Sequence, residues 1–323
     1  MTKNEFYASI AENVLSFFPP SYADAEVMIE ERVKTGDIQL HGLMITKDKS
    51  TPTPIVYLDK FWDQYLRGEK FERIITEIAA EYAQAVRNTP EIEIPDFDEK
   101  MIKDKVHLRV LDKGANRDFL SQHPSMDLGC GYAATMYIPI EGLEGRVAMT
   151  QITNDLMGSF DLDSRELFER AMENTEKEQP AVFSSIEDIL FGFGGNKLLL
   201  NDLSEVSPES GLMALTNENS HMGAIGLFYP GAQEKIGELL GENYFVLPSS
   251  IHEVLIMRES MAPAEPKQMA EMVHSINENQ VAPEDRLGNR VMYYDREAKE
   301  LSVAADYDRD MVKSQVHHRA RVR

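Results

Sequence analysis

Hydrophobic residues recur at every third or fourth position in several stretches of the chain, which is the spacing of an amphipathic helix. The clearest stretch runs from about Glu69 to Arg87, where aliphatic residues fall on one side of a helix and charged residues on the other. Pro19 and Gly241 follow two other stretches and are residues that end helices. We therefore predict helices over residues 3–18, 22–34, 59–88, 116–122, 163–174, 185–190 and 230–240, and after Pro266.

Short runs of β-branched, aromatic and aliphatic residues between these stretches predict β-strands. Residues 211–258 form the densest such region, and they read as strand, turn, strand, helix, strand, turn and strand. Neighbouring runs separated by turn residues predict hairpins that pair 132–138 with 146–153, 244–247 with 251–256, and 291–294 with 301–304. Further strands are predicted at 38–45, 55–58, 106–111, 181–183, 212–216 and 222–229.

Strand pairs and amphipathic helices in this arrangement predict an α+β fold, in which short antiparallel sheets are covered by helices. The segment TPEIEIPDFDE, residues 89–99, is acidic, carries two prolines and is the expected linker. We therefore expect an N-terminal α+β region over residues 1–95 and a C-terminal α+β domain over residues 96–305. A basic tail over residues 306–323 is expected to be flexible.

The charge of the chain restricts its partners. The 323 residues carry a formal net charge of −22, which disfavours direct nucleic-acid binding by the acidic body because phosphates would be repelled. Cys130 is the single cysteine, so the chain forms no internal disulfide and fits a reducing compartment. The N-terminus reads as an amphipathic helix rather than a signal peptide, and no stretch is long and apolar enough to span a membrane. We expect a cytoplasmic protein that contacts no membrane and whose partner is another protein.

Two motifs with catalytic potential contain a cysteine or a histidine. Cys130 lies between two glycines, but a nucleophilic cysteine needs a neighbouring base and a lowered pKa, so a half-buried thiol on a turn is the competing interpretation. His252 and Glu253 begin like a zinc-protease motif, but Ile256 occupies the position of the second histidine. His221 and His274 lie in the same half of the chain as His252 and could approach it in space.

Neither a metal site nor a cofactor site is predicted. Residues 192–197 contain glycines and a lysine but lack the spacing of a phosphate-binding loop. Asp306, Asp308 and Asp310 resemble the start of a calcium loop, whose glycine and closing glutamate are missing.

Three blocks of the sequence carry a resemblance to a known family. The blocks are MDLGCGYAATMYIPI with GRVAMTQITNDLMGSFDLDSRELFERAMENT, then LMALTNENSHMGAIGLFYPGAQEKIGELLGENYFVLPSSIHEVLIM, and then QMAEMVHSINENQVAPEDRLGNRVMYYD. Together they resemble an uncharacterised bacterial domain-of-unknown-function family that is common in gut Clostridia and often found on mobile elements. The resemblance covers most of residues 1–305 and implies no activity, cofactor or catalytic residue. A second uncharacterised bacterial family is distantly similar after Asp163 and between Tyr229 and Ile256.

Because no nucleophile–base pair, metal cluster or phosphate loop stands out, the sequence favours a non-enzymatic interaction or regulatory protein. A sharper form of this hypothesis is an acidic protein that blocks the nucleic-acid-binding surface of a partner. The alternatives are a structural subunit of a larger assembly and an enzyme of unrecognised type, which would use Cys130 or a site formed by His221, His252 and Glu253. If His221, His252 and a carboxylate line one pocket within hydrogen-bond reach of one another, the enzyme is favoured, and if they scatter over the surface it is disfavoured.

Overall fold

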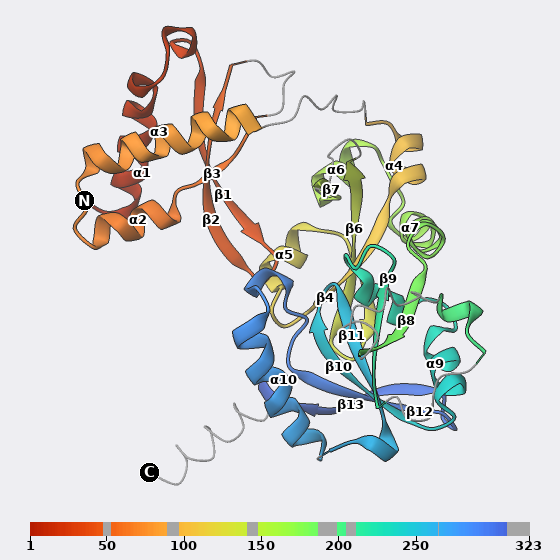
Figure 1. Cartoon of the computed structure of the whole chain (residues 1–323). Coiled ribbons are helices and arrows are strands. Elements are labelled where there is room, and N and C mark those ends of the chain that lie inside the picture. Colours follow the sequence, from red (N-terminus) through yellow and green to blue (C-terminus); the bar gives the residue numbers. More distant parts are fainter. Residues whose placement is uncertain are drawn as a thin grey trace, which may run out of the picture. The chain divides into compact units, whose positions relative to one another are not determined.

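The computed structural model describes residues 1–47, 53–88, 97–140, 148–186, 199–204, 211–263 and 265–308. These residues fold into two compact units, which we call unit 1 (up to Phe97) and unit 2 (from Asp98 on) (Figure 1). Both contain antiparallel sheets and helices, so the predicted α+β fold class is confirmed. Residues 141–147, which lie between the strands expected at 132–138 and 146–153 and include the start of the second, are outside the described residues. So are most of the helix expected at 185–190 and the basic tail from residue 309. In the described part, no helix has the length and apolar character needed to cross a bilayer.

Unit 1 consists of one antiparallel sheet and a layer of helices. Its helices are α1 (Lys3–Asn13), α2 (Asp59–Leu66) and α3 (Phe71–Asn88), with short 3₁₀ turns η1 (Val14–Phe17) and η2 (Pro20–Tyr22). Its strands are β1 (Glu26–Lys34), β2 (Ile38–Thr46) and β3 (Val56–Tyr57), in the order β1-β2-β3.

The helix predicted at residues 22–34 is wrong, because most of that stretch forms β1. Strand β1 pairs with β2 along its whole length, from Glu26 opposite Thr46 to Lys34 opposite Ile38. Gly36 and Asp37 turn the chain between the strands with φ of 78° and 50°, in the left-handed region that glycine and aspartate tolerate best. A continuous ladder of backbone hydrogen bonds therefore outweighs a weak helical spacing of apolar side chains.

An aromatic cluster forms the core of unit 1. Phe6, Phe61 and Tyr82 are fully buried there, and the ring of Trp62 lies 5.3 Å from that of Phe6. The Tyr82 hydroxyl accepts a hydrogen bond from the Ile45 backbone N–H at 2.7 Å and donates one to the Ile45 carbonyl at 3.1 Å. One buried side chain on α3 thus satisfies two backbone groups of β2.

Replacing Tyr82 with phenylalanine is expected to lower the free energy of unfolding of unit 1 by about 1–3 kcal/mol, because the Ile45 N–H is left buried without a partner. Denaturant unfolding followed by Trp62 fluorescence measures this effect, since Trp62 is the sole tryptophan and packs in this cluster. Tyr65→Phe is the control, because the Tyr65 hydroxyl bonds to no described residue and its loss should change little. Equal stability of the two variants would contradict the assigned role of the Tyr82 hydroxyl.

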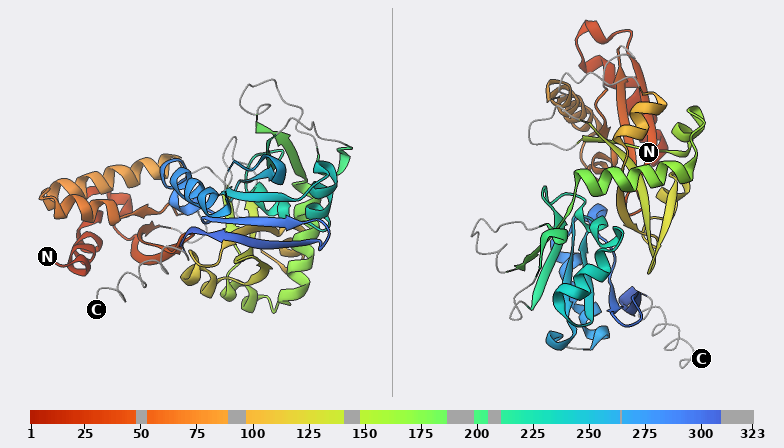
Figure 2. Two further views of the ribbon diagram at one scale, coloured as in Figure 1. Left: turned by 90° about the horizontal axis from the view of Figure 1, so that it is seen from below. Right: turned by 90° about the vertical axis from the view of Figure 1, so that its right-hand side faces the viewer.

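Unit 2 begins with a four-stranded antiparallel sheet. Strand β6 (Tyr132–Ile140) pairs with β4 (His107–Asp112) on one side, and with β5 (Ser125–Gly129) and β7 (Ala148–Gln151). Helix α7 (Ser164–Glu178) packs against β4, and in the right-hand view of Figure 2 this green helix lies across the yellow strands. The helices of this part are α4 (Glu99–Lys105), α5 (Arg117–Gln122), α6 (Asn154–Ser159) and α7 (Ser164–Glu178).

The second sheet of unit 2 has the order β13-β12-β10-β11-β9-β8 and is also antiparallel. Its strands are β8 (Ala181–Ser185), β9 (Leu212–Asn217), β10 (Tyr244–Ser250), β11 (Glu253–Arg258), β12 (Arg290–Asp295) and β13 (Glu300–Asp306). Its helices are η3 (Leu200–Asp202), η4 (Gly223–Phe228), α9 (Ala232–Leu240), η5 (Glu259–Met261), α10 (Pro266–Gln280) and η6 (Pro283–Asp285).

The three hairpins predicted in this half, β6–β7, β10–β11 and β12–β13, are confirmed. The strand predicted at 222–229 is wrong, because Gly223–Phe228 forms the 3₁₀ helix η4. The segment is apolar because residues 223–227 are all buried, and a short apolar run cannot distinguish a buried strand from a buried helical turn.

Candidate functional site

Two histidines and a carboxylate meet in unit 2. His221 lies in the turn after β9, and His252 lies in the turn between β10 and β11. Their ring centroids are 5.0 Å apart, and His252 Nε2 lies 3.6 Å from Oδ2 of Asp285 at the end of η6. We call these three residues the histidine cluster. Both predicted histidines therefore converge with a carboxylate that sequence reasoning did not single out.

The backbone around His221 is held in an unusual conformation. Ser220 and Met222, on either side of it, have φ of 50° and 55°, in the left-handed region that non-glycine residues rarely occupy. The Asn217 side chain accepts a hydrogen bond from the His221 N–H at 3.1 Å and donates one to the His221 carbonyl at 2.7 Å. A buried amide at the end of β9 therefore fixes the turn that carries His221.

His252 is oriented by hydrogen bonds on several sides. Its Nδ1 accepts from the Met222 N–H at 3.1 Å, so in the neutral ring the proton sits on Nε2, which faces Asp285. The backbone carbonyl of His252 accepts a hydrogen bond from the Thr216 hydroxyl at 2.8 Å, and its backbone N–H donates one to the Ser250 hydroxyl at 3.1 Å. These contacts assign a neighbour to both ring nitrogens of His252.

His221 differs from His252 because its Nε2 is buried and has no hydrogen-bond partner among the described residues. Burial lowers the pKa of His221 below its ordinary value, the nearby His252 lowers it further, and the charge of Asp285 raises it. The ring is therefore neutral at pH 7, with a buried nitrogen that can hydrogen-bond a ligand or exchange a proton with it.

Among the described residues, His274 Nδ1 is also buried without a partner. The His274 ring lies on α10 and stacks on Tyr307, with a centroid distance of 4.0 Å. In the described ranges it has neither a second imidazole nor a carboxylate within ion-pair distance. A buried ring nitrogen without a hydrogen-bond partner is therefore not by itself specific evidence of a site. His221 is distinguished from His274 because His252 and Asp285 lie close to it.

A chain of side-chain hydrogen bonds continues from the histidine cluster to the first sheet. Asn217 Nδ2 donates to Gln179 Oε1 at 3.3 Å, and Gln179 Nε2 donates to the Tyr137 hydroxyl at 2.9 Å. Gln179 follows the end of α7, and Tyr137 lies on β6. The cluster thus stands at the end of a polar network that joins the two sheets of unit 2.

Cys130 and Glu253, the other two residues proposed from sequence, lie apart from this cluster. The Cys130 thiol donates to the Leu301 carbonyl at 3.3 Å, and burial raises its pKa, while the charge of Arg290 lowers it. Glu253 accepts from the Ser249 hydroxyl at 3.1 Å. The structure brings neither side chain to an imidazole among the residues described, so neither has the base or ring partner that its proposed role requires.

In the described parts of the chain, no group of three or more histidine, cysteine, aspartate or glutamate side chains could hold a metal ion. His252 lies in a turn rather than on a helix, so the zinc-protease spacing has no helical face to act on.

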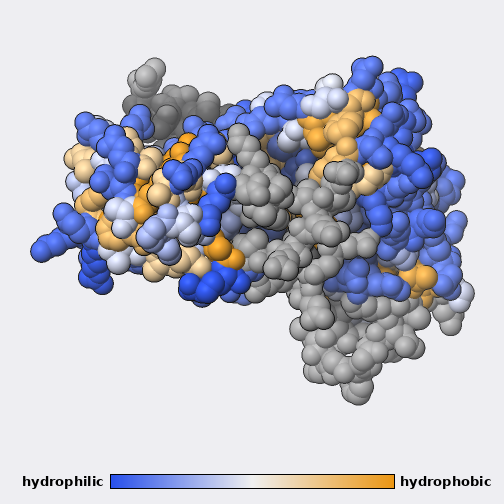
Figure 3. Space-filling view, turned by 90° about the horizontal axis from the view of Figure 1, so that it is seen from above, coloured by the Kyte–Doolittle hydropathy of each residue, from blue (hydrophilic) through white to orange (hydrophobic). Residues whose placement is uncertain are grey.

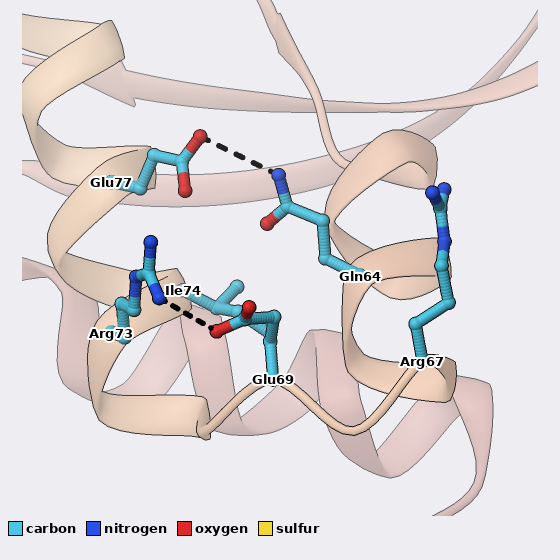
Figure 4. A pocket seen from close by; sticks show the side chains of 6 residues that line it. All are labelled: Gln64, Arg67, Glu69, Arg73, Ile74 and Glu77. Carbon is cyan, nitrogen blue, oxygen red and sulfur yellow. Dashed lines mark hydrogen bonds and ion pairs between the residues drawn. The ribbon is translucent and has the colours of Figure 1, made fainter.

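Two hollows elsewhere are small. The hollow in Figure 4 lies between α2 and α3, is lined by Gln64, Arg67 and Glu77 among others, and has a volume of ≈ 210 Å³. An apolar groove between α10 and the second sheet has a volume of ≈ 160 Å³, and Met272 and Ile276 are exposed at its side. Both are below the roughly 300–1,000 Å³ of most ligand pockets. On the face in Figure 3, hydrophobic side chains likewise form separate patches among hydrophilic ones.

Comparison with protein families shows that a known family matches most of the chain. Residues 3–296 match a family of unknown function, DUF5688. The chain belongs to the DUF5688 family. The expected membership of an uncharacterised family is thereby confirmed, and DUF5688 assigns no activity. Neither a curated protein nor a solved structure matches the chain.

The whole histidine cluster lies inside the part of the chain that matches DUF5688. Sequence reasoning missed Asp285 because it stands in the Ala-Pro-Glu-Asp-Arg segment, residues 282–286, where acidic residues and proline signal only a turn. Its approach to His252 depends on η6 lying beside the β10–β11 turn, where the Ile251 N–H donates to the Asp285 carbonyl at 2.8 Å. No local pattern encodes that contact.

Proposed function

We propose that unit 2 of this DUF5688 protein is an enzyme that performs acid–base chemistry, with His221 as its proton-transfer group. The observation that supports this proposal most is the buried, unpartnered Nε2 of His221 beside an oriented imidazole and a carboxylate. A histidine whose pKa is lowered, placed beside a second imidazole and a carboxylate, is typical of catalytic sites.

The roles of the three residues follow from their contacts. The neutral His221 ring accepts a proton from a substrate or from a water molecule, and general bases of this kind accelerate reactions by about 10²–10⁴-fold. The charge of Asp285 raises the pKa of His221 and so favours the imidazolium that forms. His252 is a positioning residue, because it binds the Met222 N–H and faces Asp285 at the same time.

The test uses isotope labelling, which detects turnover even when the substrate has not been identified. The purified protein is incubated with a small-molecule extract of bacterial cells in deuterated, ¹⁸O-labelled water, and mass spectrometry detects the compounds that gain label. The wild type is expected to label at least one compound. His221→Gln should lower that rate by about 100-fold or more.

His274→Gln is the matched control, because it also removes a buried, unpartnered ring nitrogen but from a position without a second imidazole. It should leave the rate unchanged. The proposal fails if the wild type labels nothing, or if His221→Gln and His274→Gln behave alike.

A non-enzymatic role as a cytoplasmic, acidic partner of a basic protein is the second candidate, and it is favoured by the net charge of −22. Binding of this kind would weaken with salt, because exposed charges are screened. It would also leave His221 dispensable. The labelling experiment therefore separates the two candidates without requiring that the partner be identified.

A further inference from the structure

Arg109 is a buried arginine in the middle of β4. Only 5% of its surface is exposed, and all six residues of the strand are buried. A buried charge is costly unless it is paired, with an effective cost of several kcal/mol. Burial lowers the pKa of Arg109 to about 10, while Tyr137 and Asp285 raise it, so the guanidinium is charged at pH 7.

The described residues offer this cation little compensation. Its Nε donates to the Thr135 hydroxyl at 3.3 Å, and the guanidinium lies 5.1 Å from the centre of the Phe119 ring. A cation–π contact contributes about 0.5–2 kcal/mol, which is less than the cost of burying the charge. Within the described ranges no carboxylate lies at ion-pair distance from Arg109, and of its five N–H donors only the one on Nε makes a hydrogen bond to a described residue.

Two other arginines of unit 2 show how an arginine with a structural role is compensated. Arg258, equally buried, lies 3.4 Å from Glu242 and donates to the Leu240 carbonyl. Arg290 lies 2.6 Å from Asp112. In the part of the chain that the structure describes, Arg109 has no carboxylate partner of this kind.

Arg109 belongs to the same region as the histidine cluster. The charge of Asp285 raises the pKa of both Arg109 and His221. Strand β4 packs against η4, which begins directly after Met222. Tyr137, which raises the pKa of Arg109, is linked through Gln179 and Asn217 to the turn of His221.

We infer that Arg109 binds an anionic group, a carboxylate or a phosphate, on the molecule that His221 acts on. The planar guanidinium matches both groups with paired hydrogen bonds, and a bound anion would supply the missing counter-charge. The inference rests on the proposed function only in that it identifies the bound molecule as the substrate of His221. Binding of the anion can be measured without any turnover.

The test measures anion binding by the wild type and by Arg109→Met, which keeps an unbranched apolar side chain and removes the guanidinium with its charge. Thermal unfolding is followed by circular dichroism in sodium chloride, phosphate or malonate at equal ionic strength. The wild type is expected to gain a saturable rise in melting temperature with phosphate or malonate, and the stronger of the two identifies the group. Arg109→Met should bind about 10- to 100-fold more weakly.

In chloride alone, Arg109→Met is expected to melt at the same temperature as the wild type or higher, because the uncompensated charge is gone. Arg117→Met removes an arginine from the exposed side of α5 and should bind like the wild type. Arg109→Lys keeps the positive charge but lacks the planar guanidinium that forms paired hydrogen bonds, and it should bind the anion with intermediate affinity.

Three results would overturn the inference: no saturable stabilisation by either anion, equal affinity of Arg109→Met and the wild type, or a markedly lower melting temperature of Arg109→Met in chloride. The proposed function has a separate readout, because His221→Gln should keep the anion affinity while losing turnover. If His221→Gln keeps turnover while Arg109→Met loses the anion, the proposed function fails and the anion site stands.

Discussion

Replacing Arg290 with methionine is expected to lower the free energy of unfolding of unit 2 by about 3–5 kcal/mol, the usual cost of removing one partner from a buried ion pair. Arg290 Nη1 lies 2.6 Å from Asp112 Oδ2, with side-chain exposures of 12% and 4%. Asp112 ends β4 and Arg290 begins β12, so the pair joins the two sheets. Without Arg290, the Asp112 carboxylate is left buried without its counter-charge.

Denaturant unfolding followed by circular dichroism measures this loss, because the sole tryptophan, Trp62, lies in unit 1. Combining Arg290→Met with Asp112→Asn should cost less than the sum of the single changes, since the double variant no longer leaves the Asp112 carboxylate buried without its counter-charge. Lys113→Met is the control. It breaks the exposed ion pair with Asp127, at 2.7 Å, and should cost less than about 1 kcal/mol. Equal losses for Arg290→Met and Lys113→Met would show that the buried pair adds nothing.

The parts of the fold that the sequence predicts well are those determined by neighbours along the chain. Helix α3 follows strict amphipathic spacing, and Asp163 caps α7 by accepting from the Glu166 N–H at 2.8 Å. Gly241 ends α9 in the left-handed conformation expected of a helix-terminating glycine. In each case the deciding interaction lies within a few residues.

The failures have a common cause in long-range packing. Strand β1 owes its conformation to pairing with β2, and η4 owes its apolar composition to burial against β9 and β4. Both segments satisfied a local pattern that tertiary contacts then overrode. The pairing of β10 with β11 was predicted from the sequence, but the position of β11 between β10 and β9 in the sheet was not.

The candidate site was accessible to sequence reasoning only in part, for the same reason. His221 and His252 were proposed because they lie in the same half of the chain and could converge, and they meet because β9 lies beside β11 in the sheet. Asp285 and Arg109 come from η6 and from the other sheet, and in sequence they look like an ordinary turn residue and an ordinary strand residue. Asp285 is identified by its approach to His252, and Arg109 by its burial without a carboxylate at ion-pair distance among the described residues. Only three-dimensional contacts reveal either feature.

The turn that carries His221 depends on one glycine, so Gly223→Ala is expected to affect stability and the site together. A Cβ atom at Gly223 would lie 2.5 Å from the Asn217 backbone nitrogen and 2.7 Å from the Thr216 carbonyl carbon, distances that real Cβ atoms do not adopt. Backbone atoms cannot move aside as a flexible side chain does, so β9 and the turn must separate. Overpacking of this kind costs about 1–3 kcal/mol, and more where the backbone has to shift.

The residues displaced are those that hold the histidine cluster. Asn217 bonds to the backbone of His221, and the Thr216 hydroxyl bonds to the carbonyl of His252. Histidine ring signals in a ¹H–¹³C NMR spectrum should therefore shift for His221 and His252 and stay in place for His41, which lies in unit 1.

Gly158→Ala is the matched control, because among the described residues no neighbouring atom lies within 4 Å of its added Cβ and alanine favours the helix α6. It should leave the ring signals unchanged and stabilise the protein by about 0.5–1 kcal/mol. A Gly223→Ala protein as stable as Gly158→Ala, with unshifted histidine signals, would mean that this close approach does not position the site.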